Sequence, residues 1–321
     1  MTAGAVALQW PGRHSALDPA GPQAGRIDAL WHFLWIVAAL VLLAVVAALL
    51  YAALRRRPSS LPAHATGRAR TAVTGAVGVT VLILLVFLGI NFGTGRALTV
   101  PPEDALLVRI TGKQWWWEIT YPGNPPSHQV TTANELNVPV GVPVVVELTS
   151  SDVIHSFWPP NLVGKRDLIP GETASLWFQA DSAGVYRAQC AEYCGHQHAK
   201  MAMLVVAQPR DSFEEWLARQ RDSARTPSDS LAARGQEVFL ATSCVMCHSV
   251  RGTPAGSRIG PDLTHLASRR TIAAGTLPNT RGNLAGWILD PQRIKPGSRM
   301  PSNQLSPDDL HALLAYLESL R

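Results

Sequence analysis

Charged residues are scarce in this sequence of 321 residues. They make up 16% of the chain and hydrophobic residues 47%, whereas a typical soluble domain is roughly 25% charged. No acidic residue occurs between Asp28 and Glu103. This shortage of charge indicates membrane segments, and the length alone suggests about two domains.

The acid-free region contains two uncharged hydrophobic runs, residues 33–54 and 72–92. Each is long enough for the roughly 20-residue helix that crosses a bilayer, although a buried core helix would have a similar composition. The arginines near and between the runs account for the whole net charge of +5; they are Arg55, Arg56, Arg57, Arg68 and Arg70. This charge is therefore a topology signal, and a nucleic-acid partner is not expected. By the positive-inside rule the loop is cytoplasmic, which predicts a two-pass protein of the bacterial inner membrane with both termini on the periplasmic side.

Residues 1–27 are rich in Gly, Ala and Pro and show no hydrophobic periodicity. A cleavable signal peptide needs a charged start followed directly by an apolar core, and this pattern is missing here. We expect an irregular arm that leads into the first membrane helix. Trp31 and Trp35 suit an anchor at the outer interface, although tryptophans in ordinary lipid contact would look the same in sequence.

Cysteine is also rare, with four residues in the chain. Two of them lie in Q-C-A-E-Y-C-G-H-Q-H-A-K-M-A-M, residues 189–203. The potential ligands of this motif are Cys190, Cys194, His198 and Met201, with His155 upstream in D-V-I-H-S-F. Thiolate, imidazole and thioether groups form the ligand set that redox-active copper prefers, and two thiolates can bridge two coppers. The cysteine content alone leaves a Cys190–Cys194 disulfide open as the alternative.

These two motifs together resemble the dinuclear copper A site of cytochrome c oxidase subunit II. The resemblance implies six ligands: the bridging thiolates of Cys190 and Cys194, the imidazoles of His155 and His198, the thioether of Met201 and the backbone carbonyl of Glu192. It also implies that the Glu192 carboxylate helps to bind magnesium where residues 165–171 face the oxygen-reducing subunit. His196 and Met203 match no ligand position, and we expect a surface residue and a core residue.

The surrounding region, residues 104–208, has the valine-, isoleucine- and aromatic-rich segments and the turn signals of a β-sandwich. Near its start stand three consecutive tryptophans, Trp115, Trp116 and Trp117. Successive side chains of a strand alternate faces, so at least one tryptophan is exposed or at an interface, and Trp115 and Trp117 point the same way. The resemblance implies that Trp115 lies over the copper loops and admits electrons from a docked cytochrome. A role in packing alone stays open.

The other two cysteines belong to C-V-M-C-H, residues 244–248, the pattern of covalent c-type haem attachment. The thiols of Cys244 and Cys247 add across the haem vinyl groups, and the adjacent His248 reaches the iron. A C-x-x-C redox pair or half of a zinc site are the alternatives. We expect Met300 as the sixth ligand, because histidine–methionine ligation raises the potential of the iron. The competing ligands are His265 and His311, and His311 on the last helix is expected to face solvent.

The flanks of this motif favour a compact cytochrome c. Gly235 and Phe239 are spaced to pack a preceding helix against another helix. The last segment, residues 306–320, begins with S-P-D-D, which supplies an N-cap, a proline at the first helical position and two acids at the positive end of the helix dipole. A leucine stripe follows. This arrangement resembles class I cytochromes c and, with its loops, the cytochrome tail of caa3-type oxidases.

The predicted fold is therefore multidomain, combining a two-helix transmembrane hairpin, a cupredoxin-like β-sandwich and an all-α class I cytochrome c domain. The expected boundaries are an arm over 1–27, the hairpin over 28–95, the copper A domain over 104–208, a helix and linker over 209–228, and the cytochrome over 229–321.

The resemblance implies an electron-transfer subunit of cytochrome c oxidase. A donor such as cytochrome c would pass electrons through haem c and copper A to subunit I, where oxygen is reduced to water with proton pumping. Subunit III and membrane lipid are further expected partners. One departure is the absence of an acid near the start of the second helix, which leaves the route of proton uptake open. Alternatives are a copper A and haem c subunit of a nitric oxide reductase, a quinol oxidase subunit, which would lack copper, and an assembly subunit with neither metal nor haem.

Overall fold

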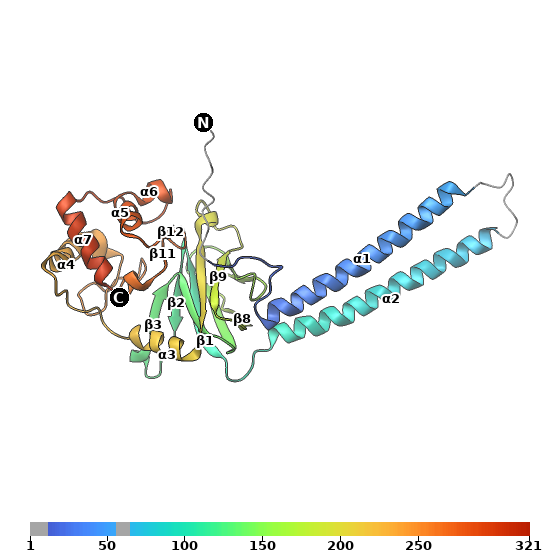
Figure 1. The fold of residues 1–321 in the computed structure, drawn as a ribbon, viewed down its shortest axis with the longest axis horizontal. Helices are drawn as coiled ribbons and strands as arrows, with labels where there is room; N and C mark the ends of the chain where they lie inside the picture. Colours follow the sequence, from blue (N-terminus) through green and yellow to red (C-terminus); the bar gives the residue numbers. More distant parts are fainter. Residues whose placement is uncertain (1–11, 56–64) are drawn as a thin grey trace, which may run out of the picture. The chain divides into compact units, whose positions relative to one another are not determined.

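The computed structural model describes residues 12–55 and 65–321 (Figure 1). The chain divides into two compact units, one formed by residues 25–100 and the other by the residues up to 24 together with 101–321.

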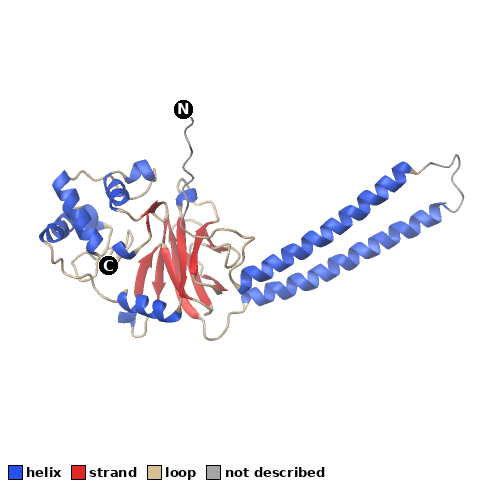
Figure 2. Ribbon diagram, viewed as in Figure 1, coloured by secondary structure: helices blue, strands red, loops and turns tan. Residues whose placement is uncertain are grey.

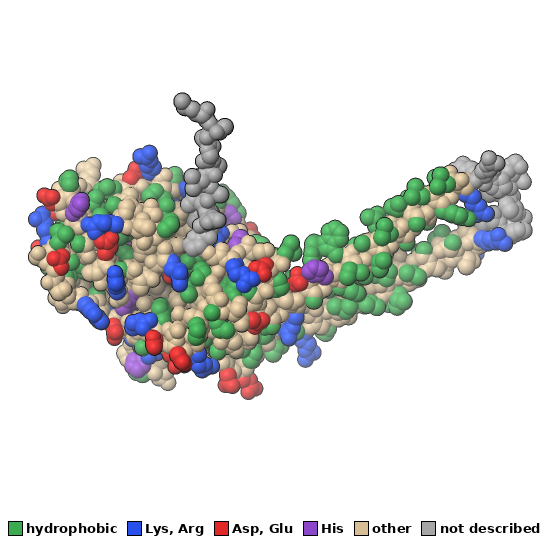
Figure 3. Space-filling model, in the orientation of Figure 1, with side chains coloured by type: hydrophobic (Ala, Val, Ile, Leu, Met, Phe, Trp, Pro, Cys, Tyr) green, Lys and Arg blue, Asp and Glu red, His purple; other side chains and the backbone are tan. Residues whose placement is uncertain are grey.

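The first unit is a hairpin of two long helices, α1 (Pro22–Leu54) and α2 (Ala65–Thr99). The Phe33 and Phe87 rings pack at 5.1 Å between centroids. The Arg26 guanidinium near the start of α1 donates to the Ala97 carbonyl near the end of α2. Both helices are long and apolar enough to cross a membrane, and hydrophobic side chains cover their surface (Figure 3). Arg56, Arg57 and the rest of residues 56–64 lie outside the described residues, as does the arm up to residue 11.

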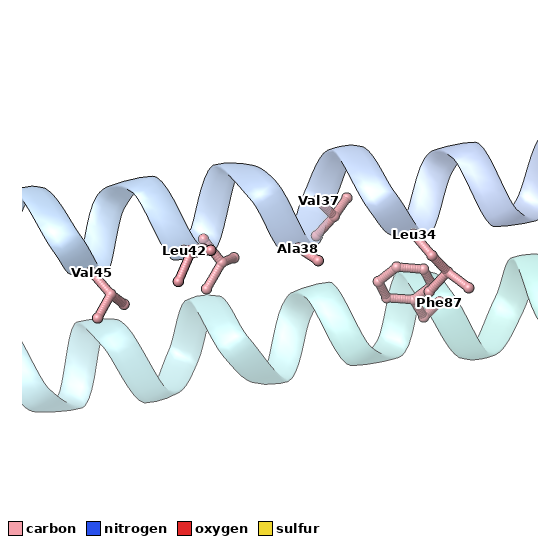
Figure 4. Close-up of a pocket in the computed structure, with 7 residues that line it drawn as sticks. Leu34, Val37, Ala38, Leu42, Val45 and Phe87 are labelled. Atoms are coloured by element: carbon pink, nitrogen blue, oxygen red, sulfur yellow. The ribbon is translucent and has the colours of Figure 1, made fainter.

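A shallow apolar groove of about 450 Å³ lies between the two helices. Phe87 of α2 lies beside Leu34, at one end of a row of α1 side chains, as Figure 4 shows. The α1 side chains are Leu34, Val37, Ala38, Val41, Leu42 and Val45. Because every lining side chain is apolar, the groove suits lipid or a membrane-embedded helix better than a polar ligand.

The second unit contains a sandwich of two five-stranded sheets (Figure 2). One sheet has the order β3-β2-β1-β5-β8 and the other β4-β10-β9-β6-β7. The strands of the first sheet are β1 (Leu106–Lys113), β2 (Trp116–Tyr121), β3 (Val130–Ala133), β5 (Val144–Ser150) and β8 (Ala174–Phe178). Those of the second are β4 (Glu135–Pro139), β6 (His155–Trp158), β7 (Arg166–Leu168), β9 (Gly184–Cys190) and β10 (Ala202–Gln208).

Alternation along the strands builds the core between the sheets. In β5, Val144, Val146 and Leu148 are fully buried while the residues between them are partly exposed. Their counterparts across the sandwich include Phe157 and Met203. The β1 and β5 strands pair in parallel, as do β4 and β10, whereas the other strand pairs within these two sheets are antiparallel. The predicted cupredoxin-like sandwich is confirmed.

The N-terminal arm differs from the prediction. Helix α1 begins at Pro22 rather than near residue 28, because proline is favoured at the first helical position, a start signal that needs no hydrophobic periodicity. Before it, Arg13 pairs with the edge of β9, donating its N–H to the Val185 carbonyl and accepting from the Arg187 N–H, each at 2.8 Å. Strand β6 pairs only with Gln189 and Cys190, the last two residues of β9. The edge of β9 before these residues is therefore free to pair with the arm.

The remaining elements form a helical module after helix α3 (Arg210–Arg219). They are α4 (Ser230–Ala241), α5 (Arg281–Leu289), α6 (Pro291–Ile294), α7 (Pro307–Ser319) and a two-strand ladder, β11 (Thr271–Ile272) with β12 (Leu277–Pro278). Short 3-10 turns cover Pro126–His128, His198–Lys200, Ser243–Met246 and Leu266–Ser268.

Helices α4 and α7 cross at a glycine. A Cβ on Gly235 would lie 1.9 Å from the Ala312 carbonyl oxygen, so only glycine allows the backbones to approach this closely. Phe239 packs against Tyr316 at 5.8 Å between ring centroids. The Ser306 hydroxyl caps α7 by accepting from the Asp309 N–H. The predicted pair of terminal helices is confirmed.

Candidate metal centre and haem cavity

The predicted copper donors come from two neighbouring strands and one loop. His155 is the first residue of β6, and Cys190 is the last residue of β9. The antiparallel register pairs Phe157 with Cys190, which places His155 beside the loop that follows β9. Cys194, His198 and Met201 lie on that loop, and the Cys190 N–H donates to the Met201 carbonyl at 2.9 Å to close it.

Five of the predicted donor side chains converge at this end of the sandwich. The Cys190 Sγ lies 3.7 Å from the Cys194 Sγ and 3.8 Å from the His155 Nδ1. The Cys194 Sγ lies 3.6 Å from the His198 Nδ1 and 3.8 Å from the Met201 Sδ. A disulfide has an S–S distance of about 2 Å, so the two cysteines are unbonded. The disulfide alternative is therefore not the state of this structure.

The two thiols are electrostatically coupled. The hydrogen bond with Cys194 is the largest cause that lowers the pKa of Cys190, and the same bond raises the pKa of Cys194. Two thiolates this close in a buried site repel each other, so the second proton is held tightly. A bound cation removes this repulsion and allows both thiols to ionise. The donor set therefore fits copper ions, which prefer thiolate, imidazole and thioether ligands.

The outer nitrogen of His155 is held by a residue that sequence analysis did not assign. Its Nε2 lies 2.8 Å from the Asp152 Oδ1, and an Nε2–H donor there leaves Nδ1 free to face the thiols. Burial alone would lower the pKa of His155, but hydrogen bonds to Cys190 and Asp152 raise it. A carboxylate behind a metal-binding imidazole fixes the ring and its tautomer. Gly112 makes room for this ring, because a Cβ there would lie 2.7 Å from the His155 Cδ2.

Glu192 is the sixth predicted donor, through its backbone. Its carbonyl oxygen lies 3.1 Å from the Cys190 Sγ, so it belongs to the same cluster. Its carboxylate points elsewhere and lies 3.5 Å from the Lys165 ammonium, which is also 3.5 Å from Asp167. These three side chains are about half exposed.

Trp115 directly contacts the loop between β9 and β10, residues 191–201, which is called the copper loop below. Its indole N–H donates to the Cys194 carbonyl at 2.8 Å, and the Gln114 amide donates to the same oxygen at 2.9 Å. Trp117 is fully buried in the sandwich core, against which Trp115 also packs. Trp116 lies next to the Lys113 ammonium, 4.8 Å from the ring centroid. Of the two residues without a predicted ligand role, His196 is exposed and Met203 is fully buried, as expected.

A cavity of about 430 Å³ lies where the helical module meets the sandwich. All four residues of the predicted haem site line it: Cys244, Cys247, His248 and Met300. Most other lining side chains are apolar, including Phe239, Leu284 and Ile288, which suits the hydrocarbon faces of a porphyrin. Trp115 and Trp116 also line this cavity, so the sandwich forms part of its wall.

The histidine of the attachment motif is oriented for iron binding. The His248 Nδ1 lies 2.8 Å from the Pro261 carbonyl oxygen, a contact that requires an Nδ1–H donor and leaves Nε2 as the free ligand atom. Burial lowers the pKa of His248 and keeps the imidazole neutral. A Cβ on Gly260 would lie 2.8 Å from the His248 Cε1, so this glycine makes room for the ring.

The candidates for the sixth iron ligand are separated by position. Met300 lines the cavity. His265 does not, and its Nε2 lies 3.2 Å from the Asp222 carbonyl and 3.4 Å from the Arg251 guanidinium. His311 is exposed on α7. Of these three described residues, Met300 is thus the one placed to reach the iron.

The cavity also offers polar groups to a bound anion. Arg269 and Thr271 line it, and the Arg269 Nε and Thr271 Oγ1 are buried without a hydrogen-bond partner. A buried donor left unpaired is costly, and a ligand that brings carboxylates satisfies it. Haem has such carboxylates, so the residues present fit haem at both its apolar and its acidic parts.

Comparisons with known proteins match the two domains that carry these candidate sites. Residues 123–208 match the family model of the periplasmic domain of cytochrome c oxidase subunit II, and residues 232–321 match that of cytochrome c. The chain is 38% identical over 319 residues to a cytochrome c oxidase subunit 2 of Alkalihalophilus pseudofirmus, covering 96% of this chain and 91% of the relative. The chain belongs to the cytochrome c oxidase subunit II family.

Further relatives include the subunit 2 of Bacillus subtilis, 31% identical over 82% of this chain and 78% of the relative. Among solved structures, the periplasmic domain of subunit II of cytochrome oxidase from Bradyrhizobium japonicum matches with 31% identity over 38% of this chain and 97% of that chain, at a TM-score of 0.36. As a subunit II with a cytochrome c domain, the protein is a membrane-anchored electron-transfer subunit of a haem–copper oxidase complex. Its domains imply copper A and haem c. The relatives do not favour the nitric oxide reductase alternative.

Proposed function

We propose that this subunit passes electrons from a donor such as cytochrome c to subunit I, where oxygen is reduced to water with proton pumping, and that it assembles with subunits I and III. One observation carries this proposal: the six predicted copper donors converge at one end of the sandwich, beside a cavity lined by the predicted haem-attachment motif. When bound, the copper pair and the haem each supply a one-electron redox couple.

In the proposed copper A centre, the Cys190 and Cys194 thiolates would hold the copper ions. His155, His198, Met201 and the Glu192 carbonyl complete the ligand set. The contacts of Asp152 with His155 support a fixed imidazole, and the buried cysteines and methionine exclude water from the site. A rigid and dry ligand cage lowers the rearrangement needed when the charge of the centre changes.

In the proposed haem site, Cys244 and Cys247 would hold the haem covalently, and His248 and Met300 would bind its iron. This pair of ligands raises the potential of the iron, as an electron carrier in an oxidase requires. Trp115 is proposed to admit electrons to the copper A centre, which its hydrogen bond to Cys194 and its place in the cavity wall support.

Two finer assignments concern the surroundings of the subunit. Both chain ends, and with them the sandwich and the cytochrome domain, are proposed to face the periplasm, because the arginines between the helices favour the cytoplasm. The half-exposed Glu192 carboxylate is proposed to help bind magnesium at the interface with subunit I. Carboxylate oxygen suits that cation. The ion would replace Lys165 as the partner of the Glu192 carboxylate, or share the carboxylate with it.

The test is purification of the complex with its native partners. We expect two coppers for each covalent haem of this subunit, in addition to the metals of subunit I, and reduction of oxygen by reduced cytochrome c. A complex that reduces nitric oxide and not oxygen would contradict the assignment. A chain without copper would instead favour a quinol oxidase subunit.

A further inference from the structure

The cytochrome domain is fastened to the sandwich through the segment that precedes Met300. Lys295 is 3% exposed, and its ammonium donates to the carbonyl oxygens of Trp115 at 2.9 Å and Ala273 at 3.3 Å. The flanking carbonyls of this segment are bound from the copper loop. The Gln197 amide donates to Pro296 at 2.7 Å, and Lys200 donates to Ile294.

A second group of bonds joins the same two domains farther from the copper loop. The buried Glu135 carboxylate of β4 accepts the N–H groups of Arg270 and Thr271, at 2.6 and 3.1 Å. Nearby, the Ala202 N–H donates to the Ala274 carbonyl at 3.1 Å. Backbone groups of the cytochrome domain are thus bound by one sandwich side chain and one sandwich strand, which fixes orientation as well as contact.

Lys295 differs from the other residues of this interface in the free energy that burial of its ammonium costs and in its contact with Trp115. Burial, with the neighbouring Lys200, lowers the pKa of Lys295 to about 7, and a buried ammonium is tolerated only with hydrogen-bond acceptors. One of its acceptors belongs to Trp115, whose indole N–H donates to the carbonyl of Cys194. Lys295 therefore joins the Met300 segment to the residue that contacts the copper loop.

We propose that Lys295 is a positioning residue, which locks the cytochrome domain against Trp115 so that electrons pass between the two centres through one fixed contact. This proposal rests on the proposed electron-transfer function. A flexible linker alone raises the effective concentration of the two domains, whereas the Lys295 contacts select one orientation of the cytochrome domain on the sandwich. External donors then reach the cytochrome domain and not Trp115, because the Trp115 side of the sandwich is covered.

The experiment compares the full-length chain, loaded with copper and haem, with its Lys295→Met variant. Loss of a buried, charge-assisted hydrogen bond lowers the ratio of locked to released domain by about tenfold or more. We expect amide hydrogen exchange to report this as an equal loss of protection at Thr271 and Ala202. After flash reduction of the haem, equilibration with copper should slow with added viscogen in the variant and not in the parent protein.

The matched control is Arg293→Met, which removes the same charge from an exposed position on α6, the short helix that ends at Ile294, just before Lys295. It should leave both readouts unchanged. Full protection with viscosity-independent transfer in Lys295→Met would overturn the proposal, as would an equal effect of the control. If Lys295→Met does not fold, Glu135→Ala replaces it. The alanine variant should release the domain, while Glu135→Gln, which keeps an acceptor oxygen, should retain protection.

These readouts separate the lock from the function. A loaded parent chain whose purified complex reduces nitric oxide and not oxygen would refute the proposed function, yet its amide protection would still show whether Lys295 holds the domains together. Normal spectra with an unprotected interface would refute the lock alone.

Discussion

The copper site and the haem cavity differ in how much space their residues leave for the group that each is proposed to hold. At the copper site, the donor atoms already lie within 4 Å of their neighbours, in a sandwich whose core is otherwise filled by side chains. In the cytochrome domain, the residues of the predicted haem site surround a cavity of about 430 Å³. The sandwich thus shapes the metal site, whereas haem is itself the largest part of the core of the cytochrome domain.

Loss of haem attachment should have the largest effect. A cavity of 430 Å³ costs on the order of 10 kcal/mol if it does not collapse, comparable with the whole stability of a domain. The Cys244→Ser, Cys247→Ser double variant should therefore leave the cytochrome domain unfolded and the sandwich folded. Calorimetry should show the unfolding transition of the sandwich alone. A cooperative unfolding transition of the cytochrome domain without haem would contradict the view that haem forms most of its core.

The second prediction tests whether the two sites are independent. Met201→Leu should alter the copper spectrum and leave the haem spectrum unchanged, and Met300→Ala should do the reverse, because each methionine belongs to one donor set. Optical and paramagnetic-resonance spectra of both variants provide the measurement. Loss of both signals in either variant that is still folded would show that the sites are coupled.

The third prediction concerns the residue behind the copper site. Asp152→Asn removes the charge that orients His155, and loss of such a partner lowers metal affinity by about 10- to 100-fold. Copper titration against a competing chelator measures this change. The control is Asp167→Asn, which removes an exposed carboxylate from the same sandwich and should leave copper affinity as it was. Equal affinities in all three proteins would exclude the positioning role of Asp152.

The smallest effect is expected at the cap of α7. The hydrogen bond from Ser306 and the pairing with Arg234 lower the pKa of Asp309. A carboxyl whose pKa is lower in the folded state stabilises that state above its unfolded pKa, and the stabilisation is lost as pH falls through the folded pKa. Asp309→Asn should therefore lower the melting temperature of the cytochrome domain slightly at neutral pH and not at all in strong acid. Asp308→Asn is the matched control, and a difference that grew on acidification would refute this explanation.

The sequence predicts the two sites well because their ligands lie in short motifs. Four of the predicted copper donors lie close together in sequence, so their convergence is a local property; they are Cys190, Cys194, His198 and Met201. The C-V-M-C-H motif can likewise be recognised without knowledge of any tertiary contact. Membrane helices and strands follow likewise from hydrophobic runs and alternation.

Other features depend on the folded geometry and have no such signal. Asp152 is only three residues from His155, and it matters because the loop before β6 turns its carboxylate back onto the imidazole. Lys295 resembles any surface lysine in sequence, and its burial depends on docking against a tryptophan 180 residues away. The contact of Arg13 with β9 arises because β6 is short, a property of the strand pairing rather than of the arm.

Paramagnetic resonance of the purified, oxidised chain tests the central claim most directly. If the Cys190 and Cys194 thiolates bridge two coppers, the hyperfine pattern should be that of one unpaired electron shared equally by two copper nuclei, and replacing either cysteine by serine should abolish it. A pattern from a single copper nucleus, or a metal-free chain with the two sulfurs bonded to each other, would contradict the account.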